Sequence, residues 1–286
     1  MNHRRPRFWG PLLALGLLLP TAAWAAGGTA SGETPLPGSH LQMAMTLYAG
    51  GITLGNITMD ATMRPGDYHL VANLQTGGMV NALWQAEIQA TASGKIQAGK
   101  VLPAFYDSFN TRRDKRQQIS LTYDNGDPRL YANPPYNVTD YAVTAPEKKN
   151  TLDPLSAVLF IVSGLGADAA DPCSVTAHVF DGRRRYDVEL SKAKPTQIKM
   201  DNGLYSGPAL QCQIAYKQLA GYKPQLLKNS EDFPPIHAWI ARFPSAVRGR
   251  AYTVPLRVWA KTSYGVIAAV ATSLKVDGAT PKSPGK

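Results

Sequence analysis

The chain has 286 residues, of which 44% are hydrophobic and 17% charged, and this length accommodates one large all-β domain or two smaller domains. Its formal net charge of +10 favours anionic partners such as phospholipid headgroups, lipid A phosphates or acidic polymers, unless the charge is simply diffuse. Its two cysteines, Cys173 and Cys212, lie too far apart for the C-x-x-C motif of a redox site.

The chain begins with the three parts of a secretory signal peptide. A basic stretch at residues 4–7 precedes an apolar stretch at residues 12–19, and a small-x-small cleavage pattern follows at residues 23–25. We therefore predict cleavage between Ala25 and Ala26 and a periplasmic mature protein. The apolar stretch is too short for an uncleaved anchor, so we do not expect an integral membrane protein.

Composition divides the chain into four regions. Residues 1–25 are the predicted signal peptide, and residues 26–39, which are rich in Gly, Ser, Thr and Pro, are predicted to be a disordered leader. Residues 277–286 are predicted to be a disordered tail for the same reason. Between them, residues 40–276 are predicted to form a single β-rich domain.

Apolar and polar residues alternate with period two over much of this domain, which is typical of half-buried antiparallel strands. The alternation is clearest at residues 41–47, 57–63, 68–74, 119–123, 175–179, 186–190 and 212–216. Asn125-Gly126 and Asn202-Gly203 are typical of hairpin turns. At residues 264–276 both faces of the predicted strand are apolar, so we expect that strand to be buried on both sides.

Residues 151–166 interrupt this alternation and predict a helix. Asp153 can cap its first turn, Pro154 suits the first helical position, and apolar residues on every face predict burial on all sides. Gly164 and Gly166 are expected to end it. About ten helical residues give a length of about 15 Å, half that needed to span a bilayer, so the helix is either a packing element or a plug or lid in a ligand-binding barrel.

Ten or more strands with short turns and one helix predict an all-β, mainly antiparallel fold. We expect a single curved, barrel-like or spiral sheet with one buried helix near residues 153–163. Two cysteines in an exported chain indicate one disulfide, and Cys212 shares an inward face with Ile214, while Cys173 precedes a strand. We therefore predict that Cys173 and Cys212 form a disulfide that staples this domain.

The sequence predicts no catalytic, cofactor-binding or metal-ligating residue. Four histidines follow the signal peptide, and none has metal-ligand spacing: His40, His69, His178 and His237. Asp187 and Glu189 lie among arginines, which favours ion pairing over acid–base chemistry. Residues 164–169 match G-x-G-x-x-A, but the motif follows a helix where a dinucleotide site requires a strand. The densest basic run, residues 112–116, suits either phosphate groups or a solvated hairpin tip.

Several motifs occur in a fixed order along the chain. LDPLSA at residues 152–157 is followed by VFDGRRRY at residues 179–186, then by Cys212 and by Gly221-Tyr222. In this the chain resembles the exported proteobacterial family known as domain of unknown function 3108, over roughly residues 41–276. It is also distantly similar to periplasmic β-spiral proteins linked to envelope integrity. The resemblance implies a disulfide-stapled, barrel-like envelope protein and carries no assigned activity.

These observations favour a non-enzymatic periplasmic protein that supports the cell envelope by binding a lipid, another apolar ligand or an envelope protein. We expect no nucleic-acid partner and no cofactor. One alternative is a hydrolase that acts on an envelope polymer or lipid, which would need convergent polar groups such as His178 or His237 with an aspartate. Another is a structural or assembly factor that uses exposed strand edges.

Overall fold

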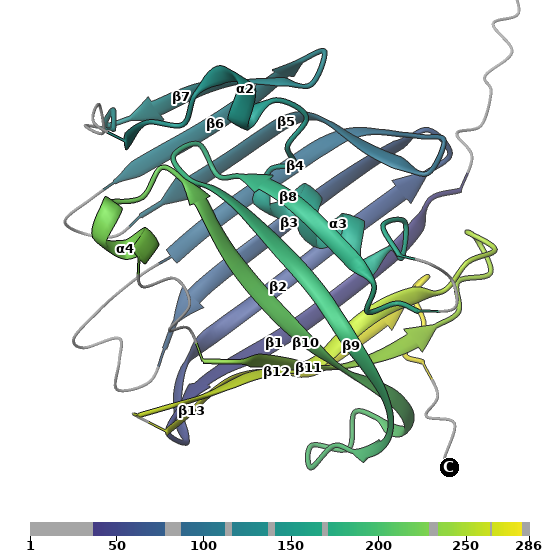
Figure 1. Cartoon of the computed structure of the whole chain (residues 1–286). Coiled ribbons are helices and arrows are strands. Elements are labelled where there is room, and N and C mark those ends of the chain that lie inside the picture. Colours follow the sequence, from purple (N-terminus) through teal and green to yellow (C-terminus); the bar gives the residue numbers. More distant parts are fainter. Residues whose placement is uncertain are drawn as a thin grey trace, which may run out of the picture. The chain divides into compact units, whose positions relative to one another are not determined.

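The computed structural model describes residues 37–77, 87–111, 116–136, 141–167, 171–228, 234–263 and 265–281, which all lie in one compact unit. Within these residues, thirteen strands form one antiparallel sheet in which strands that are consecutive in the chain are neighbours. The exception is the β7–β8 step, because these two strands lie at opposite ends of the strand order. The two halves of the sheet are joined in its middle, where β1 pairs with β13. The predicted all-β, antiparallel, curved sheet is therefore confirmed (Figure 1).

The strands of the first half are β1 (Ser39–Ala49), β2 (Ile52–Arg64), β3 (Asp67–Thr76), β4 (Glu87–Gln97), β5 (Lys100–Asn110), β6 (Gln117–Asp124) and β7 (Asp127–Asn133). Those of the second half are β8 (Val175–Phe180), β9 (Arg185–Lys199), β10 (Ser206–Ala220), β11 (Ile236–Phe243), β12 (Tyr252–Thr262) and β13 (Gly265–Val276). The described residues also contain three helices, α2 (Ala145–Lys148), α3 (Pro154–Val162) and α4 (Pro224–Lys228). The two shorter helices were not predicted.

Period-two alternation sets the register of the sheet. In β1, Leu41, Met43 and Met45 are buried while their neighbours are more exposed, so one face of the strand lines the core. Leu41 pairs with Ala61 of β2 on one side and Val276 of β13 on the other. Since a shift of one residue would expose every buried side chain of the strand, this alternation fixes the pairing.

The turn between β6 and β7 follows the sequence prediction. Asn125 and Gly126 have φ angles of 50° and 82°, and a type I′ turn requires positive φ at both central residues. Asp124 pairs with Asp127 directly across this turn, so the two strands are joined by a two-residue hairpin loop.

The prediction that the last strand is buried on both sides is wrong. Val266 and Ile267, at the start of β13, have exposed fractions of 36% and 46%. The buried residues of β13 include Ala271 and Leu274, which pair with the buried residues Met45 and Met43 of β1. In a single curved sheet only the concave face is buried. Apolar residues on the convex face and at the strand ends therefore stay exposed.

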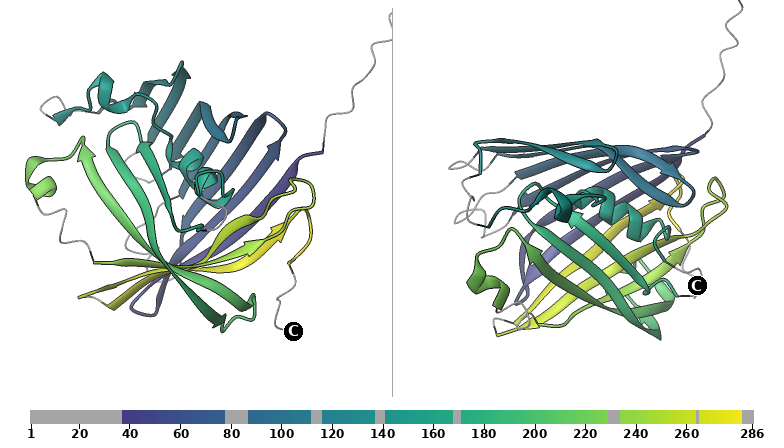
Figure 2. Two further views of the ribbon diagram at one scale, coloured as in Figure 1. Left: turned by 45° about the vertical axis from the view of Figure 1, so that its right-hand side comes forward. Right: turned by 45° about the horizontal axis from the view of Figure 1, so that its top comes forward.

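Helix α3 lies inside the curve of the sheet. It contacts β3, β4, β5, β8 and β12, and Figure 2 shows it within the concave side. Asp153 is its N-cap and Pro154 its first residue, as predicted, and Gly164 follows its C-cap with a φ of 68°. Leu159 and Val162 are buried, whereas Val158 is 38% exposed, so the predicted burial on all sides is wrong.

The predicted disulfide is present. Cys173, just before β8, is bonded to Cys212 in the middle of β10, with their Cα atoms 5.7 Å apart and both side chains buried. The bond ties the segment that leads out of α3 to the inner face of the sheet. It therefore connects two elements that are not neighbours in the strand order.

The folded region extends slightly beyond the predicted boundaries. Ser39, counted in the predicted leader, begins β1, and its hydroxyl donates a 2.6 Å hydrogen bond to Asp277, the first residue of the predicted tail. The predicted signal peptide and the Ala25–Ala26 cleavage site lie outside the described residues. So does most of the basic run at residues 112–116.

Candidate functional site: a pocket at the seam of the sheet

We call the junction between the two end strands, β7 and β8, the seam. The segment at residues 148–152 occupies it and contacts both sides. Asn150 donates its backbone N–H to the carbonyl of Gly126 in the β6–β7 turn at 2.8 Å. Leu152 exchanges two backbone hydrogen bonds with β8, at 2.8 Å to the His178 carbonyl and 2.9 Å from the Phe180 N–H. This segment thus closes the sheet where the two strands themselves do not pair.

Beside this segment lies a pocket of about 820 Å³, which we call the seam pocket. Its walls come from β5, β6, β8 and α3. The apolar part includes Val101, Leu152 and Phe160, which are buried or half-buried, and the exposed rim includes Lys95 and Lys100. Apolar walls with a few polar groups are typical of small-molecule sites, and this volume falls in their usual range.

The hydroxyl of Tyr123 is the most unusual group of the seam pocket. It is buried, and it has no hydrogen-bond partner among the residues that the structure describes. Burial raises the pKa of Tyr123, and the nearby Asp153 charge adds to this, so the phenol is a neutral donor at all physiological pH values. A buried polar group without a partner is costly, so this O–H is available to an acceptor on a ligand.

A buried polar cluster holds α3 in place. Asp153 accepts the Ser156 N–H at 2.9 Å and the Ser156 hydroxyl at 2.5 Å, and the Tyr68 and Ser156 hydroxyls lie 2.6 Å apart. Burial raises the pKa of Asp153 to about 6, and the hydrogen bonds from Ser156 oppose this rise. The cluster therefore fixes β3 against α3.

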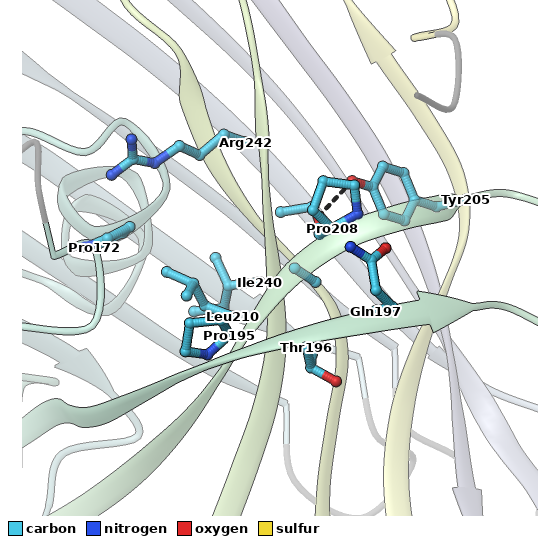
Figure 3. Close-up of a pocket in the computed structure, with 11 residues that line it drawn as sticks. Pro172, Pro195, Thr196, Gln197, Tyr205, Pro208, Leu210, Ile240 and Arg242 are labelled. Carbon is cyan, nitrogen blue, oxygen red and sulfur yellow. Dashed lines mark hydrogen bonds between the residues drawn. The ribbon is translucent and has the colours of Figure 1, made fainter. Parts of the chain in front are cut away.

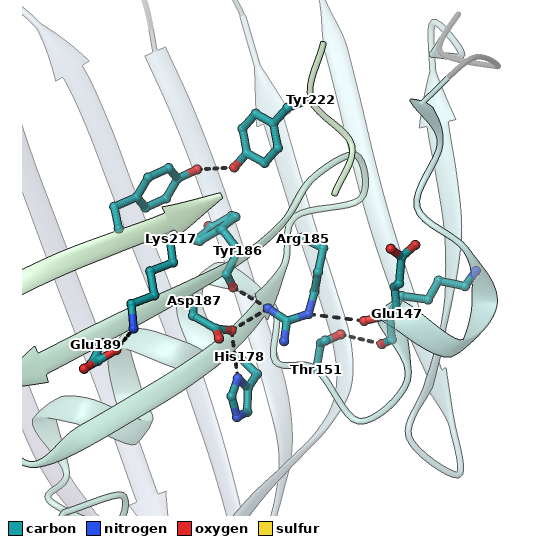
Figure 4. A network of polar contacts seen from close by, with 11 residues as sticks. Glu147, Thr151, His178, Arg185, Tyr186, Asp187, Glu189, Lys217 and Tyr222 are labelled. Carbon is teal, nitrogen blue, oxygen red and sulfur yellow. Dashed lines mark hydrogen bonds and ion pairs between the residues drawn. The ribbon is translucent and has the colours of Figure 1, made fainter. Parts of the chain in front are cut away.

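An ion-pair network lies at the rim of the seam pocket (Figure 4). Asp187 accepts hydrogen bonds from His178 Nδ1 at 2.7 Å and from Arg185 at 2.5 Å. Burial would raise the pKa of Asp187, but the hydrogen bonds from His178 and Arg185 outweigh it and lower that pKa. Arg185 also donates to the Glu147 carbonyl at 3.2 Å, which ties α2 to β9. The predicted ion pairing of Asp187 is confirmed, as is that of Glu189, which pairs with Lys217.

The four histidines lie on four different strands, His40 on β1, His69 on β3, His178 on β8 and His237 on β11. His178 lies at the rim of the seam pocket, His237 packs beside Trp259 with ring centroids 5.5 Å apart, and His40 contacts Thr62 at 3.2 Å. In the described parts of the chain, no group of three His, Cys, Asp or Glu side chains could hold a metal ion. His178 has an aspartate partner, Asp187, but Asp187 also pairs with Arg185. Arg185 therefore compensates the negative charge of Asp187 whether or not His178 carries a proton.

A second pocket, of about 660 Å³, lies at the β9–β10 hairpin and β11 (Figure 3). Its walls are largely apolar and include Pro195, Pro208 and Ile240. The hydroxyl of Tyr205 points at the Pro208 carbonyl and donates to it at 2.6 Å, so this polar group is satisfied within the protein. The seam pocket is larger and offers an unpartnered donor, so we take it as the candidate site.

From the sequence, Tyr123 is predicted only as part of a strand, and the seam pocket is not predicted. Its residues come from segments far apart in the chain, at residues 95–104, 123–126, 150–160 and 176–178. Each segment by itself has an ordinary strand, turn or helix pattern. The pocket depends on how far the sheet curls before the segment at residues 148–152 fills the seam, and no local pattern encodes that curvature.

The fold and the site define a β-rich protein in which a single curled sheet encloses one helix and leaves a pocket at its seam. The chain belongs to the family described as "Protein of unknown function (DUF3108)", whose model matches residues 42–272, so the resemblance noted in the sequence is confirmed. The structure is similar to the crystal structure of a beta-barrel-like protein of domain of unknown function DUF1849 from Brucella abortus. That similarity has a TM-score of 0.49 and 12% identity, and it covers 85% of this chain and 98% of the other. None of the curated proteins compared with the chain matches it.

Helices long and apolar enough to cross a membrane do not occur in the described ranges. The longest described helix, α3, has 9 residues.

Proposed function

We propose that this protein is exported to the periplasm and binds a lipid, or another ligand with an apolar chain, in the seam pocket. In this proposal it acts without catalysis and supports the cell envelope as a carrier or sensor of that ligand. The observation that carries the proposal is the buried, unpartnered Tyr123 hydroxyl inside a pocket of about 820 Å³ with apolar walls. A buried hydrogen-bond donor between apolar walls suits a ligand that has both an apolar chain and a hydrogen-bond acceptor.

The charge at the rim indicates the chemistry of the ligand's polar end. Lys95 and Lys100 are both exposed at the mouth of the pocket, and His178 lies there too. Cations at the mouth of an apolar cleft attract an anionic group and leave the apolar chain inside. A fatty acid or an anionic lipid fits this arrangement, since its apolar chain can pack against Val101 and Phe160 inside the pocket.

A titration with dodecanoate, followed by calorimetry, tests the proposal on the full chain. We expect binding with a Kd of about 10 µM, and weaker binding of 1-dodecanol, which lacks the anionic group. The variant Ala104→Trp places a large ring at an exposed position on the pocket wall and should abolish binding. The matched control is Ala193→Trp, also at an exposed alanine of a strand but outside the pocket, and it should bind normally.

Two results would overturn the proposal. One is the absence of dodecanoate binding to the unmodified protein, together with no lipid in native mass spectra of protein purified from the periplasm. The other is equal loss of binding in Ala104→Trp and Ala193→Trp, which would place the ligand elsewhere. Fractionation of cells tests the location separately, because a protein found in the cytoplasm would contradict export.

The pairing of His178 with Asp187 favours a second candidate function, a hydrolase that acts on an envelope lipid. An imidazole oriented by a carboxylate at the rim of an apolar pocket can serve as a general base. The test is hydrolysis of p-nitrophenyl dodecanoate by the unmodified protein and by His178→Asn. If the two proteins show equal rates, this candidate fails, and the carrier proposal remains.

The free edge of β9 does not support the assembly-factor alternative. β8 pairs only with residues 185–190 of β9, so in the described sheet the second half of β9 is an edge. This edge carries Lys192, Lys194 and Pro195, all exposed, and Lys192 has a positive φ of 57° next to a register shift. Lysine, proline and bulges on an edge hinder the addition of another strand.

A further inference from the structure

The VFDGRRRY motif forms the turn between β8 and β9 and packs against β6 and β7. The carboxylate of Asp181 accepts the backbone N–H groups of Arg183 at 2.9 Å and Arg184 at 2.6 Å, which closes the turn. Gly182 has a φ of 93°, and a Cβ there would lie 2.8 Å from Cγ2 of Ile119, so only glycine fits. The turn geometry therefore requires Asp181 and Gly182, but it does not require the arginines that follow them.

The three arginines of this turn have different surroundings. Arg185 belongs to the network with Asp187 and Glu147. Arg184 lies over the ring of Tyr222, with 5.4 Å between its guanidinium carbon and the ring centroid. Arg183 lies over the ring of Tyr136 at 5.6 Å, but its Nε atom is buried and has no hydrogen-bond partner within the described structure. Leaving a charged donor buried and unpaired is costly, so Arg183 needs an explanation.

Arg183 lines a pocket of about 450 Å³, which we call the arginine pocket. Lys148 contributes a second cation, and among the described side chains neither cation forms an ion pair. The walls are apolar or aromatic and include Leu130, Tyr131 and Phe180. Leu130 and Tyr131 are 40% and 56% exposed, although both are large and apolar in character. The pocket therefore combines an unpaired guanidinium with apolar surface open to solvent.

We propose that the arginine pocket binds a phosphate monoester carried on an apolar body. The Arg183 guanidinium, which lies over the Tyr136 ring, presents N–H donors in a rigid fork that matches the oxygens of a phosphate. Lys148 supplies the second positive charge that a dianion requires. The apolar body lies against Leu130 and Tyr131. This site shares no residue with the seam pocket, so it is a second site that does not depend on the proposed carrier function.

The test is a calorimetric titration of the full chain with dihexanoyl phosphatidic acid, dihexanoyl phosphatidylcholine and inorganic phosphate. We expect the phosphatidic acid to bind, inorganic phosphate to bind more weakly at the same site, and the phosphatidylcholine, which has no phosphate monoester, not to bind. Arg183→Gln should weaken the binding of phosphatidic acid at least about tenfold, as expected for a lost hydrogen bond to a charged group. Arg184→Gln, with the same charge change in the same turn, should bind within about twofold of the unmodified protein.

Equal weakening by Arg183→Gln and Arg184→Gln would overturn the proposal, since it would indicate diffuse attraction to basic charge. So would unchanged binding in Arg183→Gln, or equal binding of phosphatidylcholine. Because Arg183→Gln could disturb the turn, Tyr131→Ser provides a second test at a position that is 56% exposed and costs little in folding. Tyr131→Ser should weaken the binding of phosphatidic acid and leave the binding of inorganic phosphate unchanged. Any other pattern would contradict the proposed contact between Tyr131 and the apolar body of the ligand.

Discussion

Asp153 caps the first turn of α3 through two hydrogen bonds from a single residue, Ser156. The backbone N–H of Ser156 donates to Oδ1 at 2.9 Å, and its hydroxyl donates to Oδ2 at 2.5 Å. The side chains of Asp153 and Ser156 are both fully buried. The cap therefore places an ionisable group inside the sheet, and the stability of the fold must depend on its protonation.

Replacing Asp153 with Asn should change how stability depends on pH. The pKa of Asp153 is about 6 in the folded protein, above its ordinary value of 3.8, because burial disfavours the charged form. At pH values between 3.8 and about 6, the folded state therefore keeps a proton on Asp153 that the unfolded state has released. The contribution of Asp153 is greatest below pH 3.8, falls as the pH rises to about 6, and is constant above that, with a total loss of up to about 3 kcal/mol.

Chemical denaturation from pH 4 to pH 7 measures this effect as the difference in unfolding free energy between the unmodified protein and Asp153→Asn. Asn is an equally good N-cap residue, so the cap itself is kept. We expect the difference to move in favour of the variant as the pH rises. A difference that does not vary with pH would show that Asp153 keeps the same pKa in both states.

Replacing Cys212 with Ser should lower the melting temperature under non-reducing conditions. The disulfide joins residues that are 39 positions apart, and closing a loop of this length stabilises by about 3–4 kcal/mol in the chain-entropy model. Scanning calorimetry of the variant and of the double variant Cys173→Ser/Cys212→Ser measures the effect. Similar losses in both would assign it to the bond, whereas an unchanged melting temperature would rule out a stabilising role.

Arg185→Ala should destabilise the fold by about 2 kcal/mol, since it removes hydrogen bonds to Asp187, to the Tyr186 carbonyl and to the Glu147 carbonyl. The side chain of Arg185 is 13% exposed, so solvent screens these contacts little. Arg129→Ala is the matched control, because Arg129 pairs with Asp124 at 2.9 Å with a side chain that is 74% exposed. Its unfolding free energy should change by less than about 0.5 kcal/mol. Equal losses in urea unfolding would contradict the structural role of Arg185.

The sequence predicted local features well because each depends on neighbouring residues. Alternation identified the strands, and Asp153 followed by Pro154 identified the start of α3, where both take the expected positions. The exposure of Val158 and Ile267 could not be predicted in the same way. Apolar residues on two faces indicate burial only if both faces are covered, and that depends on how far the sheet curls. The seam pocket has the same cause, because it exists only where the curled sheet stops short of closing.

Tyr123→Phe should affect stability and ligand binding in opposite directions. The hydroxyl of Tyr123 is buried and has no partner among the described residues, so its removal should leave the unfolding free energy unchanged or raise it by up to about 1 kcal/mol. Dodecanoate binding should weaken about fivefold, the effect of one hydrogen bond of about 1 kcal/mol. Tyr131→Phe is the control, since Tyr131 is 56% exposed and lies outside the seam pocket, and it should change neither quantity. Urea unfolding and calorimetric titration of the same samples give both values. A clear loss of stability in Tyr123→Phe would mean that this hydroxyl already has a partner within the protein, and the seam pocket would lose the donor on which its proposed ligand depends.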